Sequence, residues 1–147
     1  MHEKAKVNST VNHKNLYEYY INDNSKLYVS HDIYSSSYLV LANDGSFIFE
    51  RHRDIRYIFL AGEFQKKNTL IKFDINCDSS FNIINRYKDS LTHEYACLPV
   101  YFENKKIYIK NDTIFFQKLD MKQPVLKFIR MEGIDSGAAP DYYDKNK

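Results

Sequence analysis

Alternation of apolar and polar residues at every second position is the main signal in this chain, and it is strongest within residues 38–75. In residues 70–75, Ile71, Phe73 and Ile75 alternate with a lysine and an aspartate, so the apolar side chains would share one face of a strand. A strand with this pattern has one buried face and one solvated face. We therefore predict a β-strand over residues 70–75 in an antiparallel sheet.

More strands precede this one, separated from one another by turn residues. Residues 46–50 place two phenylalanines on one face, and residues 57–64 alternate in the same way. Before them, residues 38–41 form an apolar run that is followed by Asn-Asp-Gly at residues 43–45. Asparagine and aspartate tolerate tight turn conformations and glycine accepts a positive φ, so this tripeptide predicts a hairpin.

The remaining strands are predicted from shorter apolar runs bounded by turn residues. They cover residues 26–30, 98–102, 106–110, 113–119 and 125–131. Proline lacks an amide donor, so the run that contains Pro99 is predicted at a sheet edge or at the start of its strand. The last run is placed to close the sheet by pairing back onto an earlier strand.

Some segments carry weaker signals. Residues 15–21 suit a short helix and a strand equally, because three tyrosines favour a strand while the apolar residues also share a helical face. Residues 31–37 and 76–80 are predicted as polar connections. Residues 80–95 fit either a strand or one helical turn.

Together these patterns predict an all-β fold of about eight to ten short strands, at the roughly 8–12-residue spacing typical of small barrels and sandwiches. Because successive strands follow one another through tight turns, an antiparallel meander barrel is favoured over a Greek key. We expect one domain over residues 14–131, with a polar arm at residues 1–13 and a polar tail at residues 132–147.

Composition supports a folded domain and narrows the function. The chain of 147 residues is 44% apolar and 16% aromatic, which argues against disorder. Its 21 basic and 19 acidic residues give a net charge of +2, which is not the footprint of a nucleic-acid binder. No apolar run reaches membrane-spanning length, and residues 1–10 lack the apolar core of a signal peptide. Two locations stay open: the cytoplasm, or the envelope or periplasm if a leader has been removed.

Cys77 and Cys97 lie about 20 residues apart, without the spacing of a zinc site. In an oxidising compartment they would form a disulfide, and closing a loop of that length would stabilise the fold by roughly 3 kcal/mol in the chain-entropy model. In a reducing compartment both would remain thiols. The sequence leaves both states open.

The run YLVLANDGSFIFE, followed by AGEF and NTLIKFDI, resembles the pattern of small bacterial lipocalin-like domains over about a quarter of the chain. The residues that carry the resemblance are Leu39, Leu41, Asp44, Gly45, Ser46, Phe47, Gly62, Phe64, Leu70, Ile71 and Phe73. Phe64 stands where that family usually has tryptophan, and the N-terminal Gly-x-Trp of true lipocalins is absent. The resemblance implies a small antiparallel barrel, often on an exported lipoprotein, with a ligand-binding or unassigned role and no catalytic residues.

Residues 51–54, Arg-His-Arg-Asp, invite comparison with the catalytic loop of protein kinases, but no glycine-rich loop precedes them and no Asp-Phe-Gly follows. One interpretation is a solvated strand end, where exposed ion pairs contribute little to stability. The functional interpretation is a basic patch that meets an acidic or phosphate-bearing partner. The members of that patch would be Arg51, His52, Arg53 and Arg56.

The histidines form no readable catalytic or metal set. His31 and His93 each precede a carboxylate, but neighbours on a strand point to opposite faces. A metal site would need His31, His52 or His93 to converge from separate loops with a carboxylate. The serines at residues 35–37 lack a Gly-x-Ser-x-Gly context. We therefore predict no catalytic residues, no metal and no cofactor.

Aromatic residues on both faces of the predicted sheet are the strongest functional signal. Tyr57 and Phe59 lie opposite an apolar face of their strand, and Tyr108 does the same on another strand. A sheet that is apolar on both faces needs a second layer, a ligand cavity or a partner. We expect a non-catalytic lipocalin-like domain that holds a small apolar ligand or docks a protein partner through this aromatic surface. The alternative is an immunity or inhibitor protein that blocks another protein, and a hydrolase-like enzyme is the third hypothesis.

Overall fold

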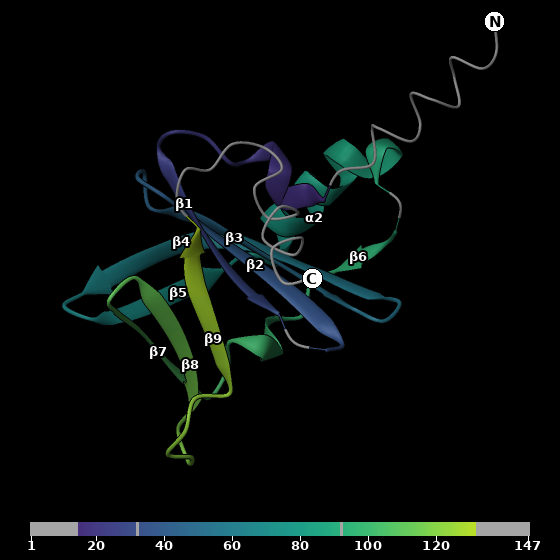
Figure 1. Ribbon diagram of the computed structural model, residues 1–147. Helices are drawn as coiled ribbons and strands as arrows, with labels where there is room; N and C mark the ends of the chain where they lie inside the picture. Colours follow the sequence, from purple (N-terminus) through teal and green to yellow (C-terminus); the bar gives the residue numbers. More distant parts are fainter. Residues whose placement is uncertain (1–14, 32, 92, 132–147) are drawn as a thin grey trace, which may run out of the picture.

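The computed structural model describes residues 15–31, 33–91 and 93–131. The arm and the tail predicted at residues 1–13 and 132–147 lie outside the described residues. The described chain forms a closed eight-stranded antiparallel barrel with one extra strand, as Figure 1 shows. The predicted all-β fold class is confirmed, and of the two architectures left open it is the barrel.

The barrel strands follow one another around the wall in chain order. Their bounds are β1 (Ser25–His31), β2 (Ser35–Ala42), β3 (Ser46–Arg53), β4 (Arg56–Lys67), β5 (Leu70–Ile75), β7 (Lys105–Lys110), β8 (Thr113–Lys118) and β9 (Leu126–Met131). The barrel closes where β9 pairs with β1, opposing Ile129 to Val29. The closing strand predicted over residues 125–131 is thus confirmed. The extra strand, β6 (Tyr95–Ala96), pairs in parallel with the first residues of β4.

The described chain holds four helical segments. One precedes the first strand, η1 (Leu16–Tyr19), and three lie between β5 and β7: α2 (Cys77–Tyr87), η2 (Lys88–Ser90) and η3 (Pro99–Tyr101). The η1 segment decides between the helix and the strand left open for residues 15–21. The α2 helix corrects two predictions, because residues 76–80 are not a simple link and residues 80–95 hold more than one helical turn. Its N-terminus is capped by Asn76, whose Oδ1 accepts a hydrogen bond from the Ser79 amide at 3.0 Å.

The strand predicted over residues 98–102 is wrong. These residues hold η3, and Pro99 suits its first position because an N–H there would have no helical partner. The Phe102 amide donates to the Pro99 carbonyl at 2.8 Å and ends the turn. The Phe102 side chain then enters the barrel. Of the three strands predicted over residues 98–119, those at residues 106–110 and 113–119 are confirmed as β7 and β8.

Strands β1 to β4 form a wall that is buried on both faces, and we call it the double-covered wall. It includes the most extensive strand pairing of the barrel, with β3 matched to β4 from Ser46–Glu63 to Arg53–Arg56. Buried side chains of its inner face include Leu39, Phe49 and Leu60. Buried side chains of its outer face include Val40, Ile48 and Phe59. The two-sided apolar pattern of these strands therefore corresponds to two separate cores.

The η1 segment and α2 supply the layer over the outer face, and both lie on the same side of the sheet in Figure 1. Tyr17 of η1 stacks on Tyr38 of β2, with ring centroids 4.1 Å apart. Tyr19 stacks on Tyr87 of α2 at 4.2 Å, so the two covering segments also hold each other. This second layer leaves Phe59, predicted on a functional aromatic surface, 0% exposed.

Hydrogen bonds fasten the start of α2 to β4 just past the last residue of β5. The Ala61 amide donates to Ser80 Oγ at 2.9 Å, and the Ala61 carbonyl accepts from the Asn76 amide at 2.9 Å. Ser80 is fully buried and its hydroxyl donates in turn to the Asn76 carbonyl. The helix thereby satisfies β4 backbone groups that β5 does not reach, since the β4–β5 ladder ends at Gly62–Ile75.

Strands β7, β8 and β9 form the opposite side of the barrel, which we call the single-covered wall. Ile107, Phe116 and Phe128 face the interior and are buried. On the outer face, Tyr108 and Phe115 stack on each other at 5.1 Å and remain partly exposed. This wall has one core face, in contrast to the other.

Phenylalanine rings fill the middle of the barrel. The Phe102 ring lies 5.0 Å from Phe49, 5.0 Å from Phe73 and 5.1 Å from Phe116, measured between centroids, and meets each nearly edge to face. Phe116 packs on Phe128 at 5.1 Å.

Candidate functional site

A groove opens in the barrel wall between β5 and β7, with a volume of about 650 Å³. This is the size of a small-molecule site. Its apolar lining residues are Leu70, Ile71, Phe73, Phe102, Ile107 and Leu119. Ile71, Phe102 and Ile107 also belong to the buried core, so the floor of the groove is the surface of the barrel interior.

The groove exists because β5 and β7 are joined at one end only. Leu70 pairs with Tyr108, and the Ile109 amide donates to the Thr69 carbonyl at 2.8 Å. No further ladder pair joins these two described strands. The chain between them leaves the wall to build α2, β6 and η3, so the two strands are not connected as a hairpin.

Positive charge surrounds the apolar floor. Lys67 and Lys72 contribute from the β4–β5 side, and Lys105 and Lys106 from β7. Among the described residues that line the groove none is acidic, and Gln65 is the remaining polar one. An apolar floor with a cationic border favours a ligand that combines hydrocarbon with negative charge.

Lys105 is the most buried of these four lysines. Burial lowers the pKa of its ammonium group, the nearby charges of Lys118 and Arg51 lower it further, and Glu103 opposes the change in part. Burial and the neighbouring positive charges both disfavour the protonated form of Lys105, and an anion bound beside it would offset these effects.

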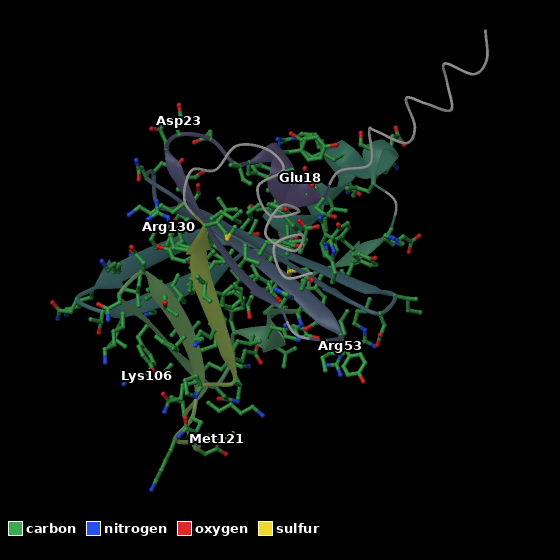
Figure 2. All side chains as sticks on the ribbon, viewed as in Figure 1. Glu18, Asp23, Arg53, Lys106, Met121 and Arg130 are labelled. Carbon is green, nitrogen blue, oxygen red and sulfur yellow. A yellow bond between two sulfur atoms is a disulfide. The ribbon has the colours of Figure 1, made fainter. Side chains whose placement is uncertain are left out.

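The predicted basic patch does not form. Arg51 projects into the barrel and is 7% exposed, because it shares the inward face of β3 with Phe47 and Phe49. Arg53 and Arg56 are exposed at the turn between β3 and β4. In Figure 2 the labelled Arg53 lies far from the labelled Lys106, so these residues and the groove occupy different parts of the surface.

The predicted aromatic residues also lie apart. Tyr57 packs against the imidazoles of His52 and His93, with centroids 4.5 and 4.1 Å away. Phe59 is covered by the second layer, and Tyr108 belongs to the single-covered wall. The structure therefore brings His52 and Tyr57 together but does not join them to Phe59 or Tyr108 in one surface.

Sequence reasoning missed Glu50, which is the centre of a cluster on the outer face of β3. Its carboxylate is 0% exposed and accepts hydrogen bonds from the Leu16 amide at 3.1 Å and the Tyr17 amide at 2.6 Å. His52 Nε2 lies 2.6 Å from it, and the Tyr95 hydroxyl donates to it at 2.5 Å. The signal in the sequence was a carboxylate that alternation places on the same face as Ile48.

The Glu50 cluster acts as a fastening between segments. Burial, followed by the Glu50 charge, raises the pKa of the Tyr95 hydroxyl well above its usual range, so Tyr95 serves as a hydrogen-bond donor. One carboxylate thus binds the start of η1, β3 and β6 together. This geometry explains why η1 stays on the barrel.

Cys77 and Cys97 are joined by a disulfide, one of the two states that the sequence left open. The bridge ties the first residue of α2 to the segment between β6 and η3. The bridge thereby holds together two points near the ends of the segment that leaves the barrel between β5 and β7.

The described part of the chain holds neither a metal-binding cluster nor a membrane-spanning helix. No group of three or more His, Cys, Asp and Glu side chains there is arranged to hold a metal ion. No helix in that part of the chain combines the length and apolar character needed to cross a bilayer.

Comparisons with known proteins returned no match, whether the chain was compared with family models, with curated proteins or with solved structures.

Proposed function

We propose that this protein is a non-catalytic binding domain whose β5–β7 groove holds an amphiphilic anion, meaning a hydrocarbon chain with an acidic head group. The observation that carries the proposal is the ring of lysines, without a lining carboxylate, around the apolar floor of the groove. The lipocalin-like resemblance of the sequence supports a binding role for a small barrel.

Two physical terms favour such a ligand. Hydrocarbon laid against Ile71, Phe102 and Ile107 would be removed from water, at about 25 cal/mol per Å² of apolar area. The acidic head would face ammonium groups that now repel one another. A neutral ligand would be stabilised by apolar burial alone. A cationic ligand would in addition be repelled by the lysines.

The filled interior explains why the groove, and not the barrel centre, is the proposed site. A ligand at the centre would have to displace Phe102, which packs on three other rings. A ligand in the groove needs no such change, because the wall is already open between β5 and β7.

Calorimetric titration with dodecanoate, dodecanol and dodecyltrimethylammonium, each below its micelle concentration, tests this proposal. We expect dodecanoate to bind most tightly and the cationic chain most weakly. The Lys72→Glu/Lys106→Glu variant should lose roughly tenfold in dodecanoate affinity, equivalent to about 1.4 kcal/mol.

The matched control is Lys26→Glu/Lys127→Glu, which changes the net charge equally at exposed residues outside the groove. An equal loss in both variants would show that net charge alone attracts the ligand. Equal binding of all three ligands would contradict the proposal.

A second candidate function, that of an immunity or inhibitor protein, is favoured by two neighbouring turns. Ile33, Tyr34 and Ile55 are 87%, 70% and 93% exposed. The first two lie between β1 and β2 and the third between β3 and β4, and the pairing of Ser35 with Arg53 brings these turns side by side. Large exposed apolar side chains next to arginine are common at protein interfaces.

Co-purification from the native cell, with wild type and Ile55→Asp in parallel, tests the second candidate. A partner that wild type recovers and Ile55→Asp loses would support it. A partner that both recover would place the interface elsewhere.

A further inference from the structure

Arg51 is a buried cation on the inner face of β3, at the end of the barrel closed by η3. Its side chain is 7% exposed, and its guanidinium carbon lies 5.2 Å from the centroid of the Tyr101 ring. The groove proposed above does not include it among its lining residues. It is therefore a separate feature of the same barrel.

The hydrogen bonds of Arg51 leave one edge of the guanidinium unused. Nη1 donates to Ser37 Oγ at 2.9 Å. Nε is buried without a hydrogen-bond partner, and no described carboxylate forms an ion pair with Arg51. The free edge, Nε with Nη2, presents two parallel N–H groups, which is the geometry that binds a carboxylate through two hydrogen bonds.

A buried guanidinium without an anion is costly, because its lost hydration is not replaced by an opposite charge. Ser37 and the Tyr101 ring offset part of that cost, but neither carries a negative charge. The charge of Lys105 has the same sign as that of Arg51, and the two side chains repel each other. Glu103 offsets part of the positive charge at Lys105 but forms no ion pair with Arg51, so the counter-charge at the guanidinium is left to a ligand.

We propose that Arg51 is an anion receptor, which takes a carboxylate on its Nε–Nη2 edge, beside Lys105 and beneath η3. The carboxylate has two sources that share this chemistry: a small free acid, or the head group of the chain held in the groove. Lys105 lines the groove, and its charge interacts with that of Arg51. The groove and the Arg51 site therefore adjoin at this lysine, as the second source requires. Only the second source rests on the proposed function.

The direct test uses NMR to monitor the side-chain Nε–H resonance of Arg51 in the wild-type protein. Acetate replaces chloride during the titration, at constant ionic strength. A carboxylate hydrogen-bonded at Nε should move this resonance in a saturable way. A resonance that stays fixed with both acetate and dodecanoate would overturn the proposal.

Dodecanoate and dodecanol separate the two sources. If dodecanoate moves the Arg51 resonance and the Ile71 and Ile107 amides with one dissociation constant, the head group of the groove ligand occupies the site. If acetate moves Arg51 and dodecanoate binds nowhere, the receptor stands and the groove function fails. If dodecanoate moves the groove amides only and acetate moves nothing, the groove function stands and the receptor fails.

Thermal unfolding of Arg51→Met provides a second readout that a merely structural arginine would not give. In chloride we expect the variant to melt at or above the wild-type temperature, because an unpaired buried charge has been removed. Acetate should raise the melting temperature of wild type and of the Arg53→Met control, but not of Arg51→Met. A variant that melts lower in chloride, with the acetate increment retained, would overturn the proposal.

Discussion

The two walls of the barrel differ in how many of their faces are buried. The double-covered wall has core side chains on both faces, with Phe49 inside and Phe59 outside, each 0% exposed. The single-covered wall has Phe116 inside, 0% exposed, and a partly exposed Phe115 outside. Because buried apolar area is the main source of folding free energy, stability should be concentrated in the first wall.

The difference also explains where a binding site is compatible with the fold. The groove lies between the two walls, where β5 continues from β4 and meets β7 of the single-covered wall through one residue pair. The segments that cover the outer face, η1 and α2, are fastened to β3 and β4 and not at this opening. The wall that carries more of the stability can therefore support an opening at its edge.

Matched truncations on the two outer faces give the largest expected contrast. Phe59→Ala should lower the free energy of unfolding by about 4 kcal/mol, because it leaves a cavity beneath η1 and α2. Phe115→Ala should lower it by about 1–2 kcal/mol, since its ring is only partly removed from water. Urea unfolding of both variants measures the difference, and equal losses would remove the distinction between the walls.

Removing the Glu50 carboxylate should be the next largest effect. Glu50→Ala leaves the buried Leu16 and Tyr17 amides without their acceptor, which we expect to cost about 3–4 kcal/mol. Glu63→Ala, at an exposed carboxylate of β4, should stay within about 0.5 kcal/mol of wild type. Guanidinium unfolding gives both values, and hydrogen exchange at Tyr17 would rise in the first variant only.

Reduction of the disulfide should lower the free energy of unfolding by about 3 kcal/mol, through the greater freedom of the unfolded chain. The measurement is the urea midpoint with and without dithiothreitol. In the Cys77→Ser/Cys97→Ser variant, dithiothreitol should leave the urea midpoint unchanged. A reduced protein as stable as the oxidised one would show that α2 stays in place without the bridge.

The smallest predicted loss concerns the attachment of α2 to β4. Ser80→Ala removes the acceptor of the buried Ala61 amide, and we expect a loss of about 1–2 kcal/mol. Ser79→Ala is the control, because only its backbone amide takes part in the helix cap. Thermal unfolding of both variants decides whether this hydrogen bond contributes to the covering of the outer face.

Local alternation predicted the strands well. The bounds of β5 agree with the prediction because Ile71, Phe73 and Ile75 alternate without interruption. The α2 helix was missed, although Asn76 at its cap and the spacing of Phe81 and Ile84 were signals for it. The run at residues 98–102 misled because apolar composition does not distinguish a strand from a short helical turn that ends inside a core.

The candidate sites were harder to predict than the strands. Alternation from Phe47 and Phe49 already places Arg51 inside, so its burial could have been read from the sequence. The groove could not be read from the sequence, because it depends on which residues of β5 and β7 fail to pair. The long segment that connects these two strands determines that pairing. The lysines that border the groove come from three separate strands and form no motif.

The disulfide also has a topological consequence. The Cα atoms of Cys77 and Cys97 are 5.8 Å apart, so the chain leaves the barrel and returns to nearly the same point. Traced through the bridge, the covalent path runs from β5 almost directly toward η3 and β7, as an uninterrupted meander would. The lobe between the two cysteines is then a pendant ring, whose distal part at η2 could be lengthened, shortened or exchanged without rerouting the barrel. Variation in such a ring would let one barrel acquire new surfaces while its strand order stays the same.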